Sequence, residues 1–276
     1  MELLKLPNLA WIACSDNPFL TSNTNTNMST QESQLKLFPS EYLNDPNKGL
    51  VLGKGASGIT RQYTLEDGTS VAVKEYASSI TSDGNPYEER KVSLVASSLK
   101  CKSFVRAIGQ TTSGSLIMEL LQDYEVFGNP PSMESCSRDV YDDDKQIEDQ
   151  QAISIVTNLL FALMKLHENG ICHGDFYGHN ILVSKAIRDS KVWLTDFGAA
   201  FFYDKDSEYG ARIDVIERRA FKHLVNEINS LYKRSYRTTG DDNDLTLNLQ
   251  DLAEKCETHS FKSLYDEWKS MIAIKI

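Results

Sequence analysis

The alternation of apolar and polar positions divides the chain into a strand-rich first part and a helix-rich second part. Short alternating runs rich in β-branched residues indicate strands, and Glu66-Asp67-Gly68 between two of them is typical of a hairpin turn. The predicted strands are residues 49–55, 58–65, 69–76, 104–110 and 115–121. Residues 86–99 fit a helix that begins at Pro86. These segments predict a small sheet-rich lobe with one helix.

Helical periodicity dominates after residue 121. Residues 122–150 are polar and acidic, which favours a loop, and residues 152–170 then carry apolar side chains at the spacing of a buried helix that ends at Gly170. Further helical patterns cover residues 216–232 and 246–272. The expected fold class is α+β, with a small antiparallel sheet and one helix followed by a mainly helical lobe.

The first 44 residues differ in character from the rest. Residues 21–44 begin with the polar run "TSNTNTNMSTQES", which buries too little apolar surface to offset the entropy of ordering, so we predict a linker. Residues 1–20 contain "LPNLAWIACSDNPF", whose L-x-x-L-x-W-x-x-C spacing resembles one leucine-rich repeat. An incidental amphipathic segment is the alternative. The main domain is expected over residues 45–276.

Composition and charge exclude several classes of function. With 41% hydrophobic and 25% charged residues the chain is of ordinary globular type. A net charge of -10 argues against a broad nucleic-acid surface, and no apolar run of 18 residues predicts a membrane span. The five scattered cysteines have no C-x-x-C spacing, which favours reduced thiols and a cytoplasmic location.

Two motifs in the predicted sheet point to a nucleotide. The stretch "LGKGASGIT" has glycines at 53, 55 and 58 between two strands, where the backbone N–H groups of a hairpin without Cβ atoms could cover phosphates. Taken alone, the motif is weak evidence and a flexible hairpin is the favoured interpretation. Lys74 lies in "VAVKEY" among inward-facing apolar residues, a position that is costly for an ammonium without a partner. Together they predict a lysine beneath a glycine loop, near the α- and β-phosphates.

Two polar motifs in the second part supply the remaining chemistry. In "ICHGDFYGHNILV", apolar flanks enclose a polar run with His173, Asp175 and Asn180, which matches the spacing H-x-D-x-x-x-x-N of a phosphoryl-transfer loop. A polar turn after a helix is the bland alternative. Asp196 follows an apolar strand in "VWLTDFGAAFF" and precedes Phe197-Gly198, where a carboxylate can turn towards Mg²⁺.

In this order and on these elements, the motifs resemble those of the eukaryotic-type protein kinases over residues 45 to about 270. The stretches "TSDGNP", "PPSMESCSRDVY", "HGDFYGHNIL", "DFGAA" and "IERRAF" are similar, more narrowly, to bacterial-type leucine-rich-repeat protein kinases. The resemblance implies two lobes, residues 45–120 and 121–276, with ATP and Mg²⁺ between them and a protein substrate.

The resemblance also implies a set of site residues. Asp175 and Lys74 would be catalytic, Asn180 and Asp196 would bind the metal, and helix 86–99 would supply a carboxylate partner for Lys74. Glu89 is favoured for that partner by its distance from "TSDGNP", and Glu88 by its place on an apolar helical stripe. The ATP-binding residues would be Leu52, Gly53, Lys54, Gly55, Ala56, Ser57, Gly58, Thr60, Ala72, Lys74, Glu89, Met118, Glu119 and Leu121.

Several positions depart from the family pattern. Gly174 replaces the usual arginine that gathers a phosphorylated activation loop, and Tyr177 replaces the usual lysine that contacts the γ-phosphate. The segment after Gly198 is short and lacks the usual A-P-E, and Glu217 takes the place of an aspartate that braces the catalytic loop.

Three functions are compatible with this pattern. The favoured one is an ATP-dependent protein kinase acting on Ser or Thr hydroxyls, because all four positions assigned to chemistry are filled. A small-molecule phosphotransferase of the aminoglycoside- or choline-kinase type is suggested by the "HGD" form and the short segment. A non-catalytic binding module is suggested by Tyr177 and the missing docking platform.

Overall fold

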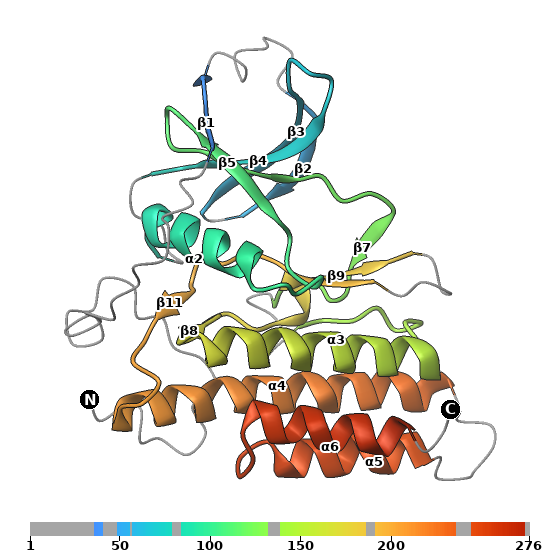
Figure 1. Cartoon of the computed structure of the whole chain (residues 1–276). Helices are drawn as coiled ribbons and strands as arrows, with labels where there is room; N and C mark the ends of the chain where they lie inside the picture. The colour runs from blue at the N-terminus through green and yellow to red at the C-terminus, as the bar shows by residue number, and fades with distance from the viewer. Residues whose placement is uncertain are drawn as a thin grey trace.

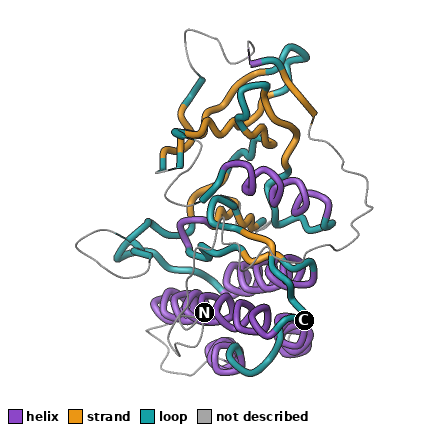
Figure 2. Tube along the Cα trace, turned by 90° about the vertical axis from the view of Figure 1, so that its left-hand side faces the viewer, coloured by secondary structure: helices purple, strands orange, loops and turns teal. Residues whose placement is uncertain are grey.

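The computed structural model consists of a small lobe built on one sheet and a larger lobe of stacked helices (Figure 1 and Figure 2). The α+β class and the order of strands before helices are confirmed. The described residues are 36–40, 49–55, 57–78, 84–131, 139–185, 191–235 and 244–273. The predicted repeat-like head, residues 1–20, lies outside these ranges.

The small lobe is a six-stranded sheet with the strand order β1-β5-β6-β4-β3-β2. The strands are β1 Lys36–Phe38, β2 Val51–Lys54, β3 Gly58–Thr64, β4 Ser70–Tyr76, β5 Ala107–Thr111 and β6 Leu116–Glu119. The predicted hairpin joins β3 to β4, and Gly68 in its turn has a positive φ of 84°. The full register from Gly58↔Tyr76 to Thr64↔Ser70 holds Lys74 in the middle of the sheet.

Helix α2, Pro86–Ser98, packs below this sheet and faces the second lobe (Figure 1). Its start agrees with the prediction: Asn85 caps the helix by accepting a hydrogen bond from the Tyr87 N–H at 2.9 Å, and Pro86 occupies the first turn, where no N–H is needed. The buried face of α2 includes Glu89 and Val92. The helix therefore carries one carboxylate into the space between the lobes.

Strand β1 corrects the prediction of a linker over residues 21–44 and of a purely antiparallel sheet. Residues 36–38 pair parallel with β5, and the Phe38 side chain is buried in the small-lobe core with Val71, Val73 and Ile117. Burial of the Phe38 side chain in the core stabilises this short strand. The prediction missed it because it rested on the average polarity of 24 residues, to which one phenylalanine adds little.

Gly109 on β5 is what allows β1 to come this close. A Cβ at Gly109 would overlap the carbonyl oxygen of Lys36 and would lie 2.6 Å from a ring carbon of Phe38. We expect Gly109→Val to displace β1 and lower the free energy of unfolding by about 1–3 kcal/mol, measured by urea denaturation. The penalty should shrink in a chain that already carries Phe38→Ala. An equal penalty in both backgrounds would contradict the role given to β1.

Four helices stack in the described part of the second lobe (Figure 1): α3 Asp149–Glu168, α4 Glu208–Ser235, α5 Asp244–Lys255 and α6 Phe261–Ala273. Helix α3 runs through the main core and buries Leu159, Leu160 and Leu163 completely. Trp268 of α6 is also fully buried, and its indole N–H donates to Thr157 Oγ1 at 2.8 Å. This core supports the loop that carries the polar motif from below.

The helical prediction needs two corrections. Helix α4 begins well before residue 216, and the stretch 246–272 is two helices, not one. The break has a local cause, because Ser260 starts a new helix: its carbonyl accepts the Leu264 N–H at 2.9 Å and its Oγ accepts the Ser263 N–H at 3.2 Å. Within the predicted loop 122–150, β7 Tyr124–Val126 adds a short strand.

Short strands between the helices hold the polar motifs in place. The three-stranded sheet β10-β9-β7 contains β9 Ile181–Ser184 and β10 Val192–Leu194, and β11 Phe201–Phe202 pairs with β8 Ile171–Cys172. The motif at 173–180, which ends in the 3-10 turn η3 Gly178–Asn180, lies between β8 and β9, and Asp196 follows β10. In the described ranges, no helix has the length and apolar character that crossing a membrane requires.

Candidate active site

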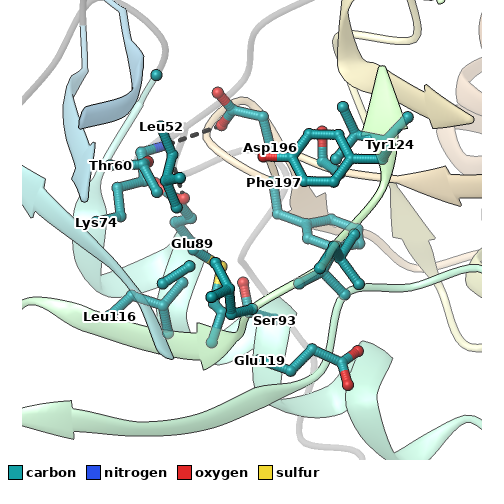
Figure 3. A pocket seen from close by; sticks show the side chains of 18 of the residues that line it. Leu52, Thr60, Lys74, Glu89, Ser93, Leu116, Glu119, Tyr124, Asp196 and Phe197 are labelled. Atoms are coloured by element: carbon teal, nitrogen blue, oxygen red, sulfur yellow. Dashed lines mark hydrogen bonds and ion pairs between the residues drawn. The ribbon is translucent and has the colours of Figure 1, made fainter. Parts of the chain in front are cut away.

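A cavity of about 240 Å³ lies between the two lobes and brings together residues from distant parts of the chain (Figure 3). Ten of the predicted site residues line it: Leu52, Gly53, Thr60, Ala72, Lys74, Glu89, Met118, Glu119, Leu121 and Asp196. The predicted residues that are described but are not among the lining residues are Lys54, Gly55, Ser57, Gly58, Asp175 and Asn180. Ala56 lies outside the described residues.

Other lining residues lie outside the predicted set. They are Ser93, Val105, Leu116, Leu120, Tyr124, Val126, Leu182, Thr195 and Phe197. Strand alternation could have identified Leu116, because it lies two residues before Met118 on the same face of β6. Leu182 and Val126 are neighbours only because β9 pairs with β7. No local sequence pattern predicts this pairing.

Lys74 lies at the centre of the site, paired with two carboxylates. Its Nζ is 2.8 Å from Glu89 Oε1 and 2.8 Å from Asp196 Oδ1, and only 6% of the residue is exposed (Figure 3). Glu88 contacts Lys91 at 3.8 Å instead, so position 89 supplies the partner. Burial disfavours the ammonium, but the charges of Asp196 and Glu89 outweigh it and raise the pKa of Lys74. The lysine is therefore held as a fixed positive charge.

Asp196 is turned towards the cavity by its backbone. The residue has a φ of +54°, which is uncommon for a non-glycine residue, and its Oδ1 accepts the Gly198 N–H at 3.1 Å. The next residue, Phe197, also lines the cavity and packs against Phe104 and His173, with ring centroids 5.9 and 5.3 Å from its own. Burial opposes the charge of Asp196, but Lys74 lowers its pKa, and 40% of the side chain remains exposed. A carboxylate is thus presented to the pocket.

Asp175 and Asn180 form one unit beside the cavity. Asn180 Nδ2 donates to Asp175 Oδ2 at 2.8 Å and to the Asp175 carbonyl at 2.9 Å. The Asn180 carbonyl accepts the Thr195 N–H at 2.9 Å, and His173 Nε2 donates to the Thr195 carbonyl at 2.9 Å. Because Thr195 immediately precedes Asp196, these bonds hold the two polar motifs side by side.

Glu217 braces the loop from below, as expected. The buried carboxylate accepts the His173 N–H at 3.0 Å, the Gly174 N–H at 2.8 Å and the Nε2–H of His167 at 2.6 Å. Burial alone would raise the pKa of Glu217, but the hydrogen bond and charge of His167 outweigh it and lower that pKa to about 2. The bracing group is an ionised carboxylate that three donors satisfy.

Asp139 is a contributor that the motifs do not reveal. Its fully buried side chain accepts the backbone N–H of Gly178 and lies 2.6 Å from His179 Nδ1. Partial burial disfavours the charged imidazole, but Asp139 and the more distant Asp175 raise the pKa of His179. Forty residues separate Asp139 from His179, so sequence spacing offers no signal for this pair.

The oxygen atoms of Asn180 and Asp196 suit a hard cation that would take its remaining ligands from a bound substrate. The described residues contain no cluster of three or more His, Cys, Asp or Glu side chains able to hold a metal by themselves. Asn180 uses its Nδ2 on Asp175, which leaves Oδ1 as its metal-facing atom, and Asp196 supplies carboxylate oxygen. Two oxygen donors are typical of Mg²⁺, which completes its coordination with phosphate oxygens and water.

Comparison with known proteins agrees with this geometry. Residues 47–221, well over half of the chain, match the protein kinase domain. A Dictyostelium discoideum protein named "Probable myosin light chain kinase" is 25% identical over 170 residues, and a Caenorhabditis elegans protein named "Cyclin-dependent kinase 4 homolog" is 28% identical over 163. The matches cover 58% and 57% of this chain and 39% of each relative. The chain belongs to the protein kinase family.

Proposed function

We propose that this chain transfers the γ-phosphoryl group of ATP to serine or threonine hydroxyls of proteins. The observation that carries the proposal is the position of Lys74 Nζ, 2.8 Å from both Glu89 and Asp196 at the edge of a cavity between the lobes. A buried lysine shared by a helix carboxylate and a metal-facing carboxylate is the arrangement that positions nucleotide phosphates in protein kinases.

The cavity is the proposed binding site of the nucleotide. One part of its wall is apolar, and there Leu52, Ala72 and Met118 surround the space proposed for adenine. The Glu119 N–H donates to the Arg106 carbonyl at 2.9 Å and is not available to a ring nitrogen of adenine. The Glu119 carbonyl is the proposed acceptor for the exocyclic amine, which donates. Leu121 is the proposed second backbone contact. The ATP-binding roles of the glycine-loop residues remain predictions.

The chemistry is divided between Asp175 and the charged groups around the phosphates. As the acceptor hydroxyl attacks the γ-phosphorus, its proton passes to the Asp175 carboxylate, and the bond to the β–γ bridging oxygen breaks to release ADP. Lys74 holds the phosphates in line, and Asp196 and Asn180 would hold Mg²⁺, which neutralises the charge that develops on the leaving group.

The leucine-rich-repeat connection and the cytoplasmic location also remain predictions.

Transfer of label from γ-labelled ATP tests the proposal. The purified chain with Mg²⁺ is offered Ser-, Thr- and Tyr-containing peptides, a basic protein, and small amines and sugars. We expect label on Ser or Thr, and a loss of about 100-fold in kcat/KM for Lys74→Met, because the substitution removes a preorganised charge from the phosphates. Lys262→Met is the matched control: it removes an exposed lysine 2.6 Å from Asp266 and should leave the rate unchanged.

The remaining outcomes separate the other two functions. Label on small amines or sugars alone would identify a small-molecule phosphotransferase. Nucleotide binding without transfer to any acceptor would identify a non-catalytic module, which is the function favoured by Tyr177 and by the short connection between β11 and α4, residues 203–207. Equal rates for wild type and Lys74→Met would contradict the position given to the phosphates.

A further inference from the structure

The activation segment, residues 199–207 between Gly198 and α4, is attached to the large lobe by backbone hydrogen bonds. Its strand β11 pairs with β8 in the register Phe201↔Cys172. One residue after β11, the Tyr203 N–H donates to the Gly170 carbonyl at 2.7 Å, just beyond the end of α3. These bonds fix the backbone from which the Tyr203 side chain enters the lobe.

The Tyr203 side chain is buried and ends at a histidine of α3. Only 5% of the residue is exposed, and its hydroxyl oxygen lies 2.6 Å from His167 Nδ1. A tyrosine hydroxyl can both donate and accept, so this hydrogen bond forms in either protonation state of the imidazole. Asp214 Oδ1 lies farther from Nδ1, at 3.4 Å, and the other oxygen of Asp214 accepts from Arg218 Nε at 2.7 Å. The hydroxyl is therefore the closer partner of Nδ1.

His167 extends this contact to the loop that carries Asp175. The second ring nitrogen, Nε2, donates to Glu217 Oε2 at 2.6 Å, and the same oxygen accepts the His173 N–H at 3.0 Å. Glu217 Oε1 accepts the Gly174 N–H at 2.8 Å. Because Gly174 directly precedes Asp175, three side chains connect the activation segment to the residue proposed to take the proton.

This series of hydrogen bonds is short and lies away from solvent. His167 and Glu217 are 7% and 3% exposed, and both bonds to the imidazole measure 2.6 Å. A buried polar atom that loses its partner finds no water to replace it, so the loss is costly. Without the Tyr203 hydroxyl, His167 would lose the nearest partner of Nδ1 and would hold Glu217 less firmly.

We propose that Tyr203 is a positioning residue for phosphoryl transfer, whose hydroxyl acts through His167 and Glu217 to hold the backbone before Asp175. The inference rests on the proposed function, because it concerns the same reaction. Tyr203 is not among the described residues that line the cavity, so its effect on the reaction is exerted through its neighbours.

Removal of the hydroxyl alone tests the inference. We expect Tyr203→Phe to lower kcat about 3- to 10-fold with an unchanged KM for ATP, because a small displacement of Asp175 impairs proton transfer and leaves the nucleotide pocket intact. Tyr232→Phe is the matched control and should leave kcat unchanged: Tyr232 is also buried, and its hydroxyl donates to Asp149 Oδ1 at 3.1 Å, at the opposite end of α3. An unchanged kcat for Tyr203→Phe, or an equal loss for Tyr232→Phe, would contradict the inference.

A double variant shows whether the hydroxyl acts through the imidazole. In a chain that carries His167→Ala, the further change Tyr203→Phe should lower kcat less than about twofold, because the connection is already broken. The full loss in that background would mean that Tyr203 does not act through His167, and would overturn the inference.

Hydrogen exchange separates this inference from the proposed function, because it needs no turnover. Tyr203→Phe should speed deuterium uptake several-fold in peptides that cover the amides of His173 and Gly174, and Tyr232→Phe should not. Unchanged uptake in Tyr203→Phe, or the same increase in both variants, would overturn the inference, also where His167→Ala fails to fold. Faster uptake confined to Tyr203→Phe, in a chain whose wild type transfers no phosphate, would contradict only the proposed function.

Discussion

Replacing Asp196 by asparagine is expected to lower the rate of phosphoryl transfer at least 100-fold without unfolding the chain. The substitution keeps the shape of the side chain, and asparagine tolerates the positive φ of +54° that the backbone requires. It removes the negative charge that contacts Lys74 and that would hold Mg²⁺ against the phosphates. Preorganised charge of this kind is typically worth about 10²- to 10³-fold in rate.

The stability of the Asp196→Asn variant should change little. Lys74 keeps Glu89 as a partner at 2.8 Å, so the buried ammonium is not left alone, and we expect a loss below about 2 kcal/mol. Asp123→Asn is the matched control, because Asp123 has a φ of 55°, is exposed, and is not among the residues that line the cavity. The test is to measure the initial rates and melting temperatures of the wild type, Asp196→Asn and Asp123→Asn. A variant with more than a third of the wild-type rate would contradict the role of Asp196.

The second large effect is expected at Gly174, where alanine should cost about 3 kcal/mol or more in the free energy of unfolding. Gly174 has a φ of +79°, and a Cβ there would overlap the carbonyl oxygen of Ala199. The left-handed backbone alone costs an alanine about 1–2 kcal/mol, and the overlap with rigid backbone adds to it. Ala199 belongs to the activation segment, which is the stretch between Gly198 and α4. This segment would have to move, so the rate of phosphoryl transfer should fall as well.

Gly68→Ala distinguishes the two contributions. Gly68 has a nearly identical φ of 84°, and a Cβ there meets nothing within 4 Å. Urea denaturation of both variants should show the larger loss at Gly174, and the difference measures the close approach of Ala199. Equal losses would mean that the backbone conformation alone explains why position 174 requires a glycine.

The geometry at Gly174 is incompatible with an arginine at this position. The activation segment itself occupies the space beside Gly174, where β11 pairs with β8 and the Tyr203 N–H donates to the Gly170 carbonyl at 2.7 Å. Backbone pairing holds the segment against the catalytic loop, and a side chain at position 174 would overlap the Ala199 carbonyl, so this backbone does not accommodate an arginine there.

Much of the fold could be predicted because its elements have local causes. Alternation predicts the five central strands, Pro86 marks the start of α2, and Gly170 follows the end of α3. The elements that were predicted wrongly also have identifiable physical causes. Strand β1 depends on one buried Phe38 in a polar segment, and the break before α6 depends on Ser260, a single capping residue within an otherwise continuous helical pattern.

The site could be predicted in part for a related reason. Motif spacing predicts Lys74, Asp175, Asn180 and Asp196 as site residues, and the structure places Lys74 and Asp196 in one cavity with the Asp175–Asn180 pair beside it. The choice of Glu89 over Glu88 was open in the sequence, since adjacent helical residues differ by about 100° in direction and only packing decides which one faces Lys74.

By itself, the amino-acid sequence determined the two-part architecture, the kinase-like order of motifs and the residue types available for chemistry, because these depend on near neighbours along the chain. The tertiary structure alone decided that Asp139 orients His179 and that Ala199 excludes a side chain at position 174. Each of these is a contact between segments 25 or more residues apart, set by how helices and strands pack, and such contacts leave no periodicity in the sequence.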